Sequence, residues 1–508
     1  MHRKIARSSD EFFNRLEAQC LSVTYADVML RSGYSEVMPD NVDISTVFSK
    51  NTPLNIPIVS AAMDTVTEAE LAIAIAKLGG LGVIHKNLST DEQASEVGRV
   101  KFHLNGLIEK PICFRENDTI EQIIQKKEEK KWEFSTFPIV NSSDVLVGLL
   151  TDNDFKFPEK TNVRVKKVMT DVLITGKKDT TIKEAYRTLK ENKKGVLPLV
   201  DESGKIAGMY VFKDVKRIIL GDNKSYNVDI HGNLRVAAAI GVYDDAFKRV
   251  EKLKSKRVDV VVIDTAHGDS KPVLETLKKL KKMNLPFDIV VGNISEPGSA
   301  ERLCKAGADG IKVGQGPGGI CTTRLVAGIG APQITAVYEC SKVAERYGIP
   351  VCADGGLKYS GDIAKAIGAG AHSVMMGSML AGTTEAPGKI VRWDGREWKS
   401  YRGMGSLGAM ESNKGSRERY NQEKTGKSQL IAEGVEGRVP FKGNLSDVIT
   451  QYVGGLRRGM GYVSAENIEE LRQKANFRRV TDAGQEESHP HVALVKEPPN
   501  YSIQGAKK

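Results

Sequence analysis

Residues 308–324 read Ala-Asp-Gly-Ile-Lys-Val-Gly-Gln-Gly-Pro-Gly-Gly-Ile-Cys-Thr-Thr-Arg and join an apolar segment of strand length to a glycine-rich loop. Four glycines and a proline within residues 314–319 prevent regular helix or strand. Such a loop brings backbone N–H groups close to a ligand, or directs carbonyls at a cation. It leads to Cys321, and amide dipoles with the nearby Arg324 favour a reactive thiolate. The stretch therefore predicts a strand that ends in an active-site loop; the alternative is a glycine-rich turn with a small buried cysteine.

Eight apolar segments of strand length occur along the chain, with helix-compatible segments between them. They are residues 57–60, 81–86, 237–242, 258–263, 287–291, 308–313, 349–354 and 372–376. Eight repeats of strand and helix favour a closed (β/α)₈ barrel, the TIM barrel, within the α/β class. A doubly wound open sheet is the alternative.

The helix expected after the first strand carries its own boundary signals. Thr67 and Glu70 have the spacing of a capping box and predict a helix over residues 68–78. Gly79 and Gly80 then end it, because glycine readily adopts the left-handed conformation of a helix C-terminus.

Polar residues or glycines follow most of the predicted strands. They are Ser60, Asp264, Asn293, the Cys321 loop, Asp354-Gly-Gly356 and Gly377-Ser378. In a barrel the carboxyl ends of the strands meet on one face, where active sites lie. Any one of these residues alone is more often a turn residue, but their shared position predicts a site.

Residues from about 100 to 230 interrupt the barrel and contain two similar halves. Phe137-Pro-Ile-Val140 in the first half corresponds to Leu197-Pro-Leu-Val200 in the second, a period of about 60 residues that indicates an internal duplication. The predicted domains are residues 1–100, an arm and the first part of the barrel; 101–225, the insert, with halves of about 105–163 and 164–225; and 226–508, the rest of the barrel with the catalytic loop, a flap and the tail.

A polar segment follows the last strand. Residues 411–438 are charged, rich in glycine and poor in apolar side chains, so we do not expect them to pack as core. A long connection of this kind is typical of a mobile lid over a site or of a disordered linker.

Composition limits the class of protein. The chain has 508 residues, a net charge of +10 and six cysteines without CxxC spacing, and it lacks an apolar signal segment or a run of about 18 apolar residues. These features predict a cytoplasmic protein without a membrane span. Basic and acidic residues are interleaved, which favours a mixed solvated surface and an anionic small substrate over nucleic acid.

Several motifs together closely resemble the inosine 5′-monophosphate (IMP) dehydrogenase family over nearly the whole chain. They are Val59-Ser-Ala-Ala-Met-Asp-Thr-Val66, His85-Lys-Asn87, Ile263-Asp-Thr-Ala-His-Gly268, Gly316 to Arg324, Ala353-Asp-Gly-Gly356, Met376-Gly-Ser378, Tyr401-Arg-Gly-Met-Gly405 and Glu433-Gly434. The insert halves resemble CBS domains, which pair and commonly bind adenine or guanine nucleotides, and Thr151, Asp154 and Asp214 match their ribose-phosphate positions. The alternative is an insert that serves assembly only.

The resemblance implies a TIM barrel with an inserted tandem CBS pair, a homotetramer, and octamers as a further assembly through the CBS domains. It also implies NAD-dependent oxidation of IMP to xanthosine monophosphate (XMP) in guanine nucleotide synthesis. Cys321 would attack C2 of the purine, hydride would pass to NAD⁺, and the lid would then assist hydrolysis of the covalent intermediate. The catalytic residues implied are Cys321, Thr323, Arg419 and Tyr420.

Binding roles are also carried over from the resemblance. The IMP-binding residues implied are Gly319, Asp354, Gly356, Gly377, Ser378, Tyr401, Met404, Gly405 and Glu433. Those implied for NAD are Asp264, His267, Asn293, Gly314 and Gly316. A K⁺ ion would be held by carbonyls of Gly316, Gly318 and Cys321, with Glu487, Ser488 and His489 of a neighbouring subunit. Gly319 departs from the family, which usually has a serine there whose hydroxyl contacts the phosphate.

Two other functions remain as alternatives. GMP reductase shares the barrel, the cysteine and the phosphate site but deaminates GMP with NADPH; Glu339 lies in the region where reductases pair a glutamate with the threonine after the cysteine. The lid residue Arg419 and the Glu433-Gly434 motif favour the dehydrogenase. A nucleotide sensor or nucleic-acid binder that uses the insert and the positive charge is disfavoured by Cys321 and Arg419.

Overall fold

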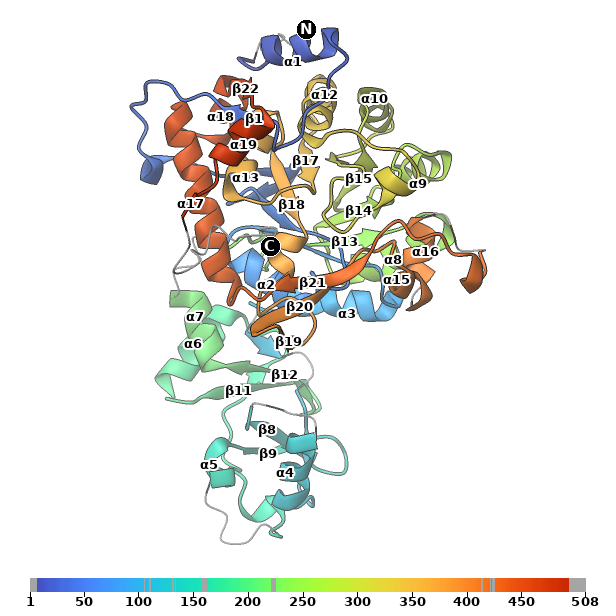
Figure 1. Cartoon of the computed structure of the whole chain (residues 1–508). Coiled ribbons are helices and arrows are strands. Elements are labelled where there is room, and N and C mark those ends of the chain that lie inside the picture. Colours follow the sequence, from blue (N-terminus) through green and yellow to red (C-terminus); the bar gives the residue numbers. More distant parts are fainter. Residues whose placement is uncertain are drawn as a thin grey trace. The chain divides into compact units, whose positions relative to one another are not determined.

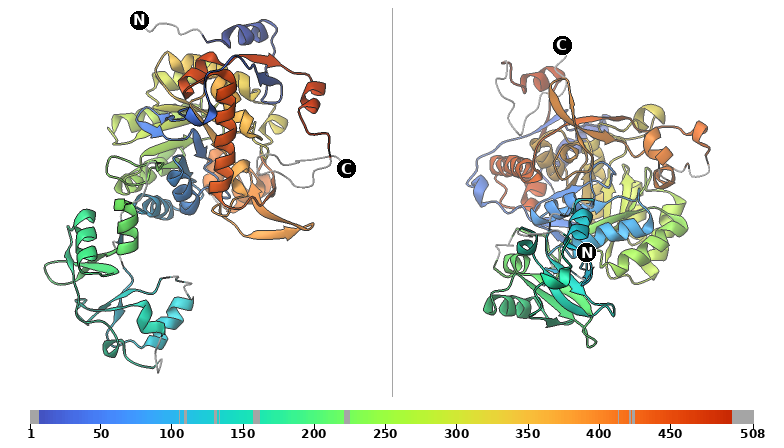
Figure 2. Two further views of the ribbon diagram at one scale, coloured as in Figure 1. Left: turned by 90° about the vertical axis from the view of Figure 1, so that its left-hand side faces the viewer. Right: turned by 90° about the horizontal axis from the view of Figure 1, so that it is seen from below.

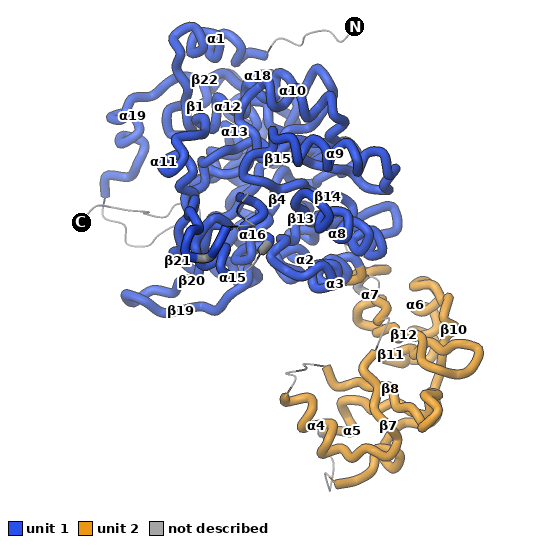
Figure 3. The backbone as a smooth tube through the Cα atoms, turned by 90° about the vertical axis from the view of Figure 1, so that its right-hand side faces the viewer, with its two compact units in different colours: residues 1–101, 225–508 blue, residues 102–224 orange. Residues whose placement is uncertain are grey.

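The computed structural model describes residues 7–104, 106–108, 111–129, 132, 134–156, 162–220, 225–412, 414–420, 422 and 425–492. The chain forms two compact units, residues 1–101 with 225–508 and residues 102–224 (Figure 3). No helix within the described residues is long and apolar enough to cross a membrane.

Eight parallel strands close into a barrel in the first unit (Figure 1). They are β4 (Ile58–Ser60), β5 (Leu81–Ile84), β13 (Val236–Ile240), β14 (Val260–Asp264), β15 (Asp288–Ile294), β16 (Gly310–Val313), β17 (Val351–Asp354) and β18 (Ser373–Met376). Their order is β13-β14-β15-β16-β17-β18-β4-β5, closed between β5 and β13. The predicted TIM barrel is therefore confirmed, and the open sheet is excluded.

Helices cover the outside of the barrel (Figure 2). They are α2 (Ala69–Lys77), α3 (Thr90–Lys101), α8 (Tyr243–Ser255), α9 (Lys271–Lys282), α10 (Pro297–Lys305), α12 (Gln333–Glu345), α13 (Ser360–Gly368) and α17 (Leu445–Val463). Helix α8 shows why they dock: its buried residues Ala246, Val250 and Leu253 recur every three or four positions and form one apolar stripe.

The start of α2 differs from the sequence prediction. Thr67 does not cap the helix, because its hydroxyl donates to the carbonyl of Ala61 at 2.7 Å and contacts the hydroxyl of Ser60 at 2.8 Å. The helix begins at Ala69, whose N–H donates to the Glu96 carboxylate at 2.7 Å. The capping box is therefore wrong, since a side chain 27 positions away replaces the local partner. The predicted end at Gly79, with φ of +96°, is confirmed.

Smaller elements surround the barrel. Strand β1 (Val28–Leu30) pairs with β22 (Phe477–Arg479), β2 (Thr46–Ser49) pairs with β3 (Thr52–Leu54), and β19 (Ile390–Trp393), β20 (Arg396–Arg402) and β21 (Glu436–Pro440) form a three-stranded sheet. The remaining helices are α1 (Asp10–Ala18), α11 (Thr323–Val326), α14 (Ser378–Ala381), α15 (Leu407–Ser412), α16 (Lys414–Arg419), α18 (Ile468–Lys474) and α19 (Asp482–Glu487).

The second unit contains the same arrangement twice. The first copy comprises β7 (Phe114–Arg115), α4 (Ile120–Glu129), β8 (Phe137–Val140), β9 (Leu146–Leu150) and α5 (Asp152–Lys156), and the second β10 (Gly176–Lys177), α6 (Ile182–Glu191), β11 (Val196–Val200), β12 (Ile206–Val211) and α7 (Phe212–Leu220). In each copy the first strand is parallel to the second, and the second is antiparallel to the third. Strand β6 (Leu107–Ile108) extends the second sheet. The predicted internal duplication is present in the structure.

Candidate active site

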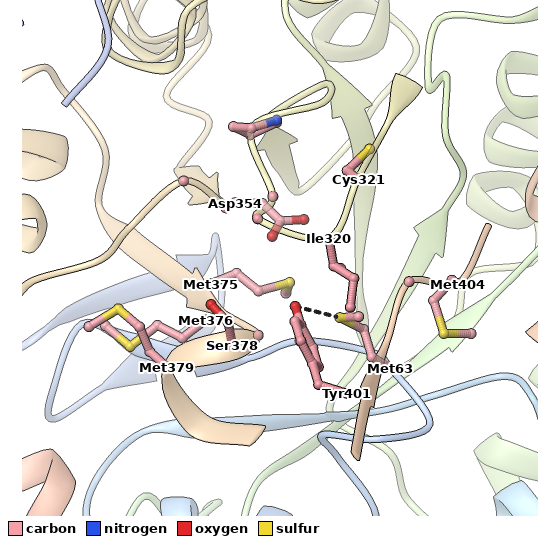
Figure 4. A pocket seen from close by; sticks show the side chains of 18 of the residues that line it. Met63, Ile320, Cys321, Asp354, Met375, Met376, Ser378, Met379, Tyr401 and Met404 are labelled. Atoms are coloured by element: carbon pink, nitrogen blue, oxygen red, sulfur yellow. Dashed lines mark hydrogen bonds between the residues drawn. The ribbon is translucent and has the colours of Figure 1, made fainter. Parts of the chain in front are cut away.

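A cavity of about 1170 Å³ lies at the carboxyl ends of the barrel strands (Figure 4). Among its lining residues are Asp264, Asn293, Gly314, Gly316, Gly318, Gly319, Cys321, Thr323, Asp354, Gly356, Gly377, Ser378, Tyr401, Met404, Arg419, Tyr420 and Glu433, all of which the sequence had singled out. The fold therefore gathers residues from distant parts of the chain around one space.

Five of the residues implied to have catalytic, binding or metal roles do not line this cavity, and neither does Ser60. Gly405 lies directly behind it, since a Cβ there would be 2.5 Å from the ring of Tyr420. His267 is exposed, and its ring contacts the side chain of Gln315, which does line the cavity, at 3.1 Å. The other three are tail residues in or just after α19, namely Glu487, Ser488 and His489.

The loop that carries Cys321 is fixed by backbone hydrogen bonds to a later segment. The N–H of Thr322 donates to the carbonyl of Glu433 at 3.1 Å, and the N–H of Val435 donates to the carbonyl of Ile320 at 3.0 Å. Within the loop, the N–H of Cys321 donates to the carbonyl of Gly318 at 3.0 Å. The segment around Glu433 therefore positions the cysteine as well as lining the cavity.

A chain of hydrogen bonds leads from the thiol to a carboxylate. The Sγ of Cys321 donates to the Oγ1 of Thr323 at 3.2 Å, and that hydroxyl donates to the Oε2 of Glu433 at 2.7 Å. Glu339, the residue that kept the reductase alternative open, lies on α12 and does not line the cavity. The glutamate that pairs with Thr323 is therefore Glu433.

A buried lysine that the sequence analysis did not single out joins the two aspartates of the cavity. Lys312 on β16 is 1 % exposed, and its Nζ lies 2.6 Å from Asp354 Oδ2 and 3.0 Å from Asp264 Oδ1. Asn293 contacts the same ammonium and donates to Asp354 at 2.9 Å. A lysine within an apolar strand was the available signal, because a buried ammonium requires paired acceptors.

Another part of the cavity gathers polar groups around the start of α14. The hydroxyl of Tyr401 lies 3.7 Å from the sulfur of Met63, shown by the dashed line in Figure 4, and is hydrogen-bonded by the backbone of Ser378. Burial raises the pKa of Tyr401, so its hydroxyl stays protonated. A Cβ at Gly377 would lie 2.8 Å from this hydroxyl, so glycine permits the close approach.

An unpaired lysine lines the same cavity. The Nζ of Lys442 donates to the carbonyl of Met379 at 3.3 Å and to the hydroxyl of Tyr452 at 3.1 Å. It has no carboxylate partner within the described residues. Burial lowers its pKa to about 8.

The charged segment after the barrel packs more closely than its composition suggested. Arg419 forms an ion pair with Asp264, and its carbonyl accepts the N–H of Ala266 at 3.1 Å. Burial lowers the pKa of Arg419 and raises that of its neighbour Tyr420. The expectation that residues 411–438 do not pack is thus wrong for residues 416–420, because polar partners on the barrel, rather than apolar area, hold them.

Comparison with known proteins identifies the family. The family model for the IMP dehydrogenase / GMP reductase domain matches residues 22–491. The chain belongs to the IMP dehydrogenase / GMP reductase family. It is 49% identical over 486 residues to inosine-5′-monophosphate dehydrogenase of Halalkalibacterium halodurans, covering 95% of this chain and 98% of that protein. It is 48% identical over 488 residues to the protein of the same name from Aquifex aeolicus, with the same coverage.

A solved structure of the family also resembles the chain. The crystal structure of a cysteine-to-alanine variant of GMP reductase from Trypanosoma brucei, in complex with guanosine 5′-monophosphate, superposes with a TM-score of 0.82. Its sequence is 38% identical, and the match covers 94% of this chain and 100% of that one. The family resemblance found in the motifs is therefore confirmed.

Gly319, where the family resemblance implies a serine, has open space around it. A Cβ at Gly319 would meet no heavy atom within 4 Å, and Gly319 is not among the residues with positive φ. A serine would therefore fit this position without strain. The difference at Gly319 is a missing hydroxyl rather than a change of loop shape.

Proposed function

We propose that this protein oxidises IMP to XMP with NAD⁺ in guanine nucleotide synthesis. The observation that carries the proposal is the hydrogen-bonded series Cys321, Thr323 and Glu433 in the same cavity as Arg419. The cavity thus contains a nucleophile, Cys321, a carboxylate that can accept its proton, Glu433, and a group proposed to activate water, Arg419. The similarity to named IMP dehydrogenases at nearly full length supports the same reaction.

The first half-reaction uses the thiolate. Thr323 and Glu433 lie along the route by which the proton leaves Cys321, and the sulfur then forms a bond to C2 of the purine. C2 becomes tetrahedral and loses hydride with its electron pair, leaving the purine bound to Cys321. Bound NAD⁺ supplies the acceptor for this hydride.

The second half-reaction returns the enzyme to its starting state. Water adds to C2, the bond from carbon to the Cys321 sulfur breaks, and XMP leaves as the thiolate forms again. Burial lowers the pKa of Arg419, whereas its ion pair with Asp264 acts in the opposite direction, so water activation is proposed for Arg419 from the family resemblance and its position in the cavity. Thr323, hydrogen-bonded to Glu433, provides a second route for the proton of that water.

Two groups of lining residues are proposed to bind the ribose and the phosphate of the substrate. Asp354, held by Lys312, is suited to accept hydrogen bonds from the ribose hydroxyls. Gly356, Gly377, Ser378 and Tyr401 would hold the phosphate. Gly319, Met404, Gly405 and Glu433 would surround the rest of the nucleotide.

The residues proposed for NAD adjoin residues 416–420, which we call the docked segment. Asp264 would bind the nicotinamide ribose, with Asn293, Gly314 and Gly316 beside it and His267 on the adenosine side. Asp264 is buried among polar groups at the end of β14, which suits a carboxylate that accepts from ribose hydroxyls.

A K⁺ ion would be held by the carbonyls of Gly316, Gly318 and Cys321, with Glu487, Ser488 and His489 of the partner subunit. Carbonyl oxygens suit this cation. The Gly318 carbonyl already accepts one N–H but keeps a second lone pair, so this donor set fits. The ion would stabilise the shape of the cysteine loop.

The second unit is proposed to be a tandem CBS pair that binds purine nucleotides as effectors. Thr151 donates its N–H and hydroxyl to Asp154 at 2.7 and 2.9 Å at the start of α5, and Asp214 lies in α7 at the equivalent point of the other copy. We propose a homotetramer, octamers through this unit, and a cytoplasmic location, consistent with six unpaired cysteines.

One assay separates the family's two activities. The purified protein is mixed with IMP and NAD⁺, and separately with GMP and NADPH, while nicotinamide absorbance is followed. We expect NADH from the first mixture only, and none from Cys321→Ser, which still binds IMP because the phosphate and ribose contacts remain. NADPH consumption with GMP and no reaction with IMP would establish the reductase instead, the activity named for the 38% identical Trypanosoma brucei structure.

A further inference from the structure

A glutamate of residues 416–420 places its carboxylate at the carboxyl ends of two neighbouring barrel strands, β5 and β13. The Oε1 of Glu418 accepts the N–H of Val242, just after β13, at 2.6 Å. Its Oε2 lies 3.1 Å from the Nζ of Lys86, just after β5. Glu418 is 9 % exposed and Lys86 is 3 % exposed, so water screens the pair little.

The space for this carboxylate depends on a glycine. A Cβ at Gly241 would lie 2.0 Å from Oε1 of Glu418 and 2.5 Å from Nζ of Lys86. Any other residue would therefore fill the position that the carboxylate occupies. Lys86, Gly241 and the N–H of Val242 together form what we call the carboxylate socket.

The charges around the socket make its two partners depend on each other. Burial lowers the pKa of Lys86, the pairing with Glu418 opposes that shift, and the nearby cations Arg419 and Arg249 add to it. Removing the Glu418 carboxylate from the socket would leave the buried ammonium of Lys86 without its anionic partner, with the guanidinium of Arg249 nearby. A buried charge without its partner is unfavourable, so the pair stabilises the docked arrangement.

The socket lies one residue away from Arg419. The carbonyl of Arg419 accepts the N–H of Ala266, and its guanidinium pairs with Asp264 inside the cavity. On the other side, Ser416 contacts Asn87 at 2.9 Å. Fixing residue 418 therefore fixes the backbone from which Arg419 extends.

We propose that Glu418, by occupying the carboxylate socket, docks residues 416–420 on the barrel and so positions Arg419 for hydrolysis, a role that rests on the proposed function. Glu418 and Lys86 are then positioning residues that do not touch the substrate. The Glu418–Lys86 pair then influences whether residues 416–420 dock or NAD⁺ binds, because Arg419 and the proposed NAD⁺ site share Asp264.

Glu418→Gln tests the charge of the pair with little change of shape. Charge-assisted hydrogen bonds are about twice as strong as neutral ones, so we expect steady-state turnover to fall about tenfold or more. The NADH burst should keep its rate, because it does not need the docked segment. The purine adduct on Cys321 should accumulate, as intact-protein mass spectrometry would show. Glu418→Asp should recover part of the turnover.

Gly241→Ala tests the socket without altering any charge. Its methyl group would exclude the carboxylate, so the same separation of burst and turnover is expected. Lys86→Met should resemble Glu418→Gln, and the double variant should be no worse than the poorer single one. Glu251→Gln, an exposed glutamate on α8, is the matched control and should behave as wild type.

Trypsin cleavage at Arg417 and Arg419 reports docking independently of catalysis. We expect faster cleavage there in Glu418→Gln and Gly241→Ala than in wild type. Equal cleavage, together with an unchanged ratio of burst to turnover, overturns the proposal, as does additivity of the two single variants. If the wild type forms no NADH from IMP and NAD⁺, the proposed function fails, yet the cleavage rates still decide whether the socket docks the segment.

Discussion

The guanidinium of Arg419 pairs with the carboxylate of Asp264, the residue proposed to bind the nicotinamide ribose. One carboxylate thus has two candidate partners, one from the chain and one from the cofactor. Because Arg419 fills the cavity beside Asp264, we propose that hydride transfer and hydrolysis use this space in turn. The Nζ of Lys312 lies 3.0 Å from the other oxygen of this carboxylate, Oδ1, so Asp264 is paired with a cation on both oxygens.

Removing the guanidinium should separate the two half-reactions. Arg419→Ala should give a rapid burst of about one NADH per active site, followed by turnover slowed at least about a hundredfold, because hydrolysis loses its water-activating group. Asp264 keeps its pairing with Lys312, so the variant should fold normally. Stopped-flow absorbance measures the burst, and mass spectrometry detects the adduct. An equal slowing of burst and turnover without adduct would assign Arg419 to binding instead.

Restoring the missing hydroxyl should strengthen substrate binding. Gly319→Ser places a hydroxyl in open space at the cavity without positive-φ strain. We expect the KM for IMP to fall about tenfold to a hundredfold with little change in kcat, since a hydrogen bond to a charged group contributes about 1.5–3 kcal/mol. Gly319→Ala is the control, because it has the same backbone effect without the hydroxyl. An unchanged KM in the serine variant would show that another donor already fills this role.

The barrel could be predicted because of how its strands are buried. Strands of a parallel barrel are covered on both faces, so their sequences are continuous apolar runs such as residues 260–263. Polar residues that end those runs, such as Asp264 and Asp354, then fall on one face by topology alone. This is why much of the cavity lining could be named from sequence.

The parts that sequence could not supply depend on partners distant in the chain. Thr67 has the spacing of a helix cap, yet its hydroxyl donates to the carbonyl of Ala61, just after strand β4. Charge and glycine content suggested that residues 411–438 do not pack, yet Glu418 is buried because Lys86 and a backbone N–H receive it. Lys312 could not be assigned from sequence, because its partners Asp264 and Asp354 come from other strands and the pattern of one strand does not show them.

Deleting the second unit should leave catalysis intact. Replacing residues 102–224 by a flexible linker of about ten Gly and Ser residues keeps every barrel strand and every lining residue of the cavity. We expect turnover of IMP within about twofold of wild type. Purine nucleotides should change the activity or assembly of the full chain but not of the deletion variant. A folded deletion variant that cannot oxidise IMP would contradict this.

The last prediction concerns stability and pH at Lys442. Because burial lowers its pKa to about 8, the unfolded chain, with an ordinary lysine pKa near 10.5, binds more protons than the folded one between these values. Stability therefore rises with pH over this window, and the penalty for burying the ammonium is fully present below pH 8. The neighbouring Tyr452 does not titrate there, since burial raises its pKa.

Lys442→Met removes this penalty. The gain in unfolding free energy of this variant over wild type should therefore be larger at pH 7 than at pH 10. Between pH 7 and pH 10 the difference in unfolding free energy should shift in favour of wild type by about 2 kcal/mol. Denaturant unfolding at the two pH values measures it, and Lys389→Met, at an exposed lysine, serves as the control. A difference that does not vary with pH would mean that Lys442 keeps its charge over the whole range, as it would if an anion from outside the chain paired with it in the cavity.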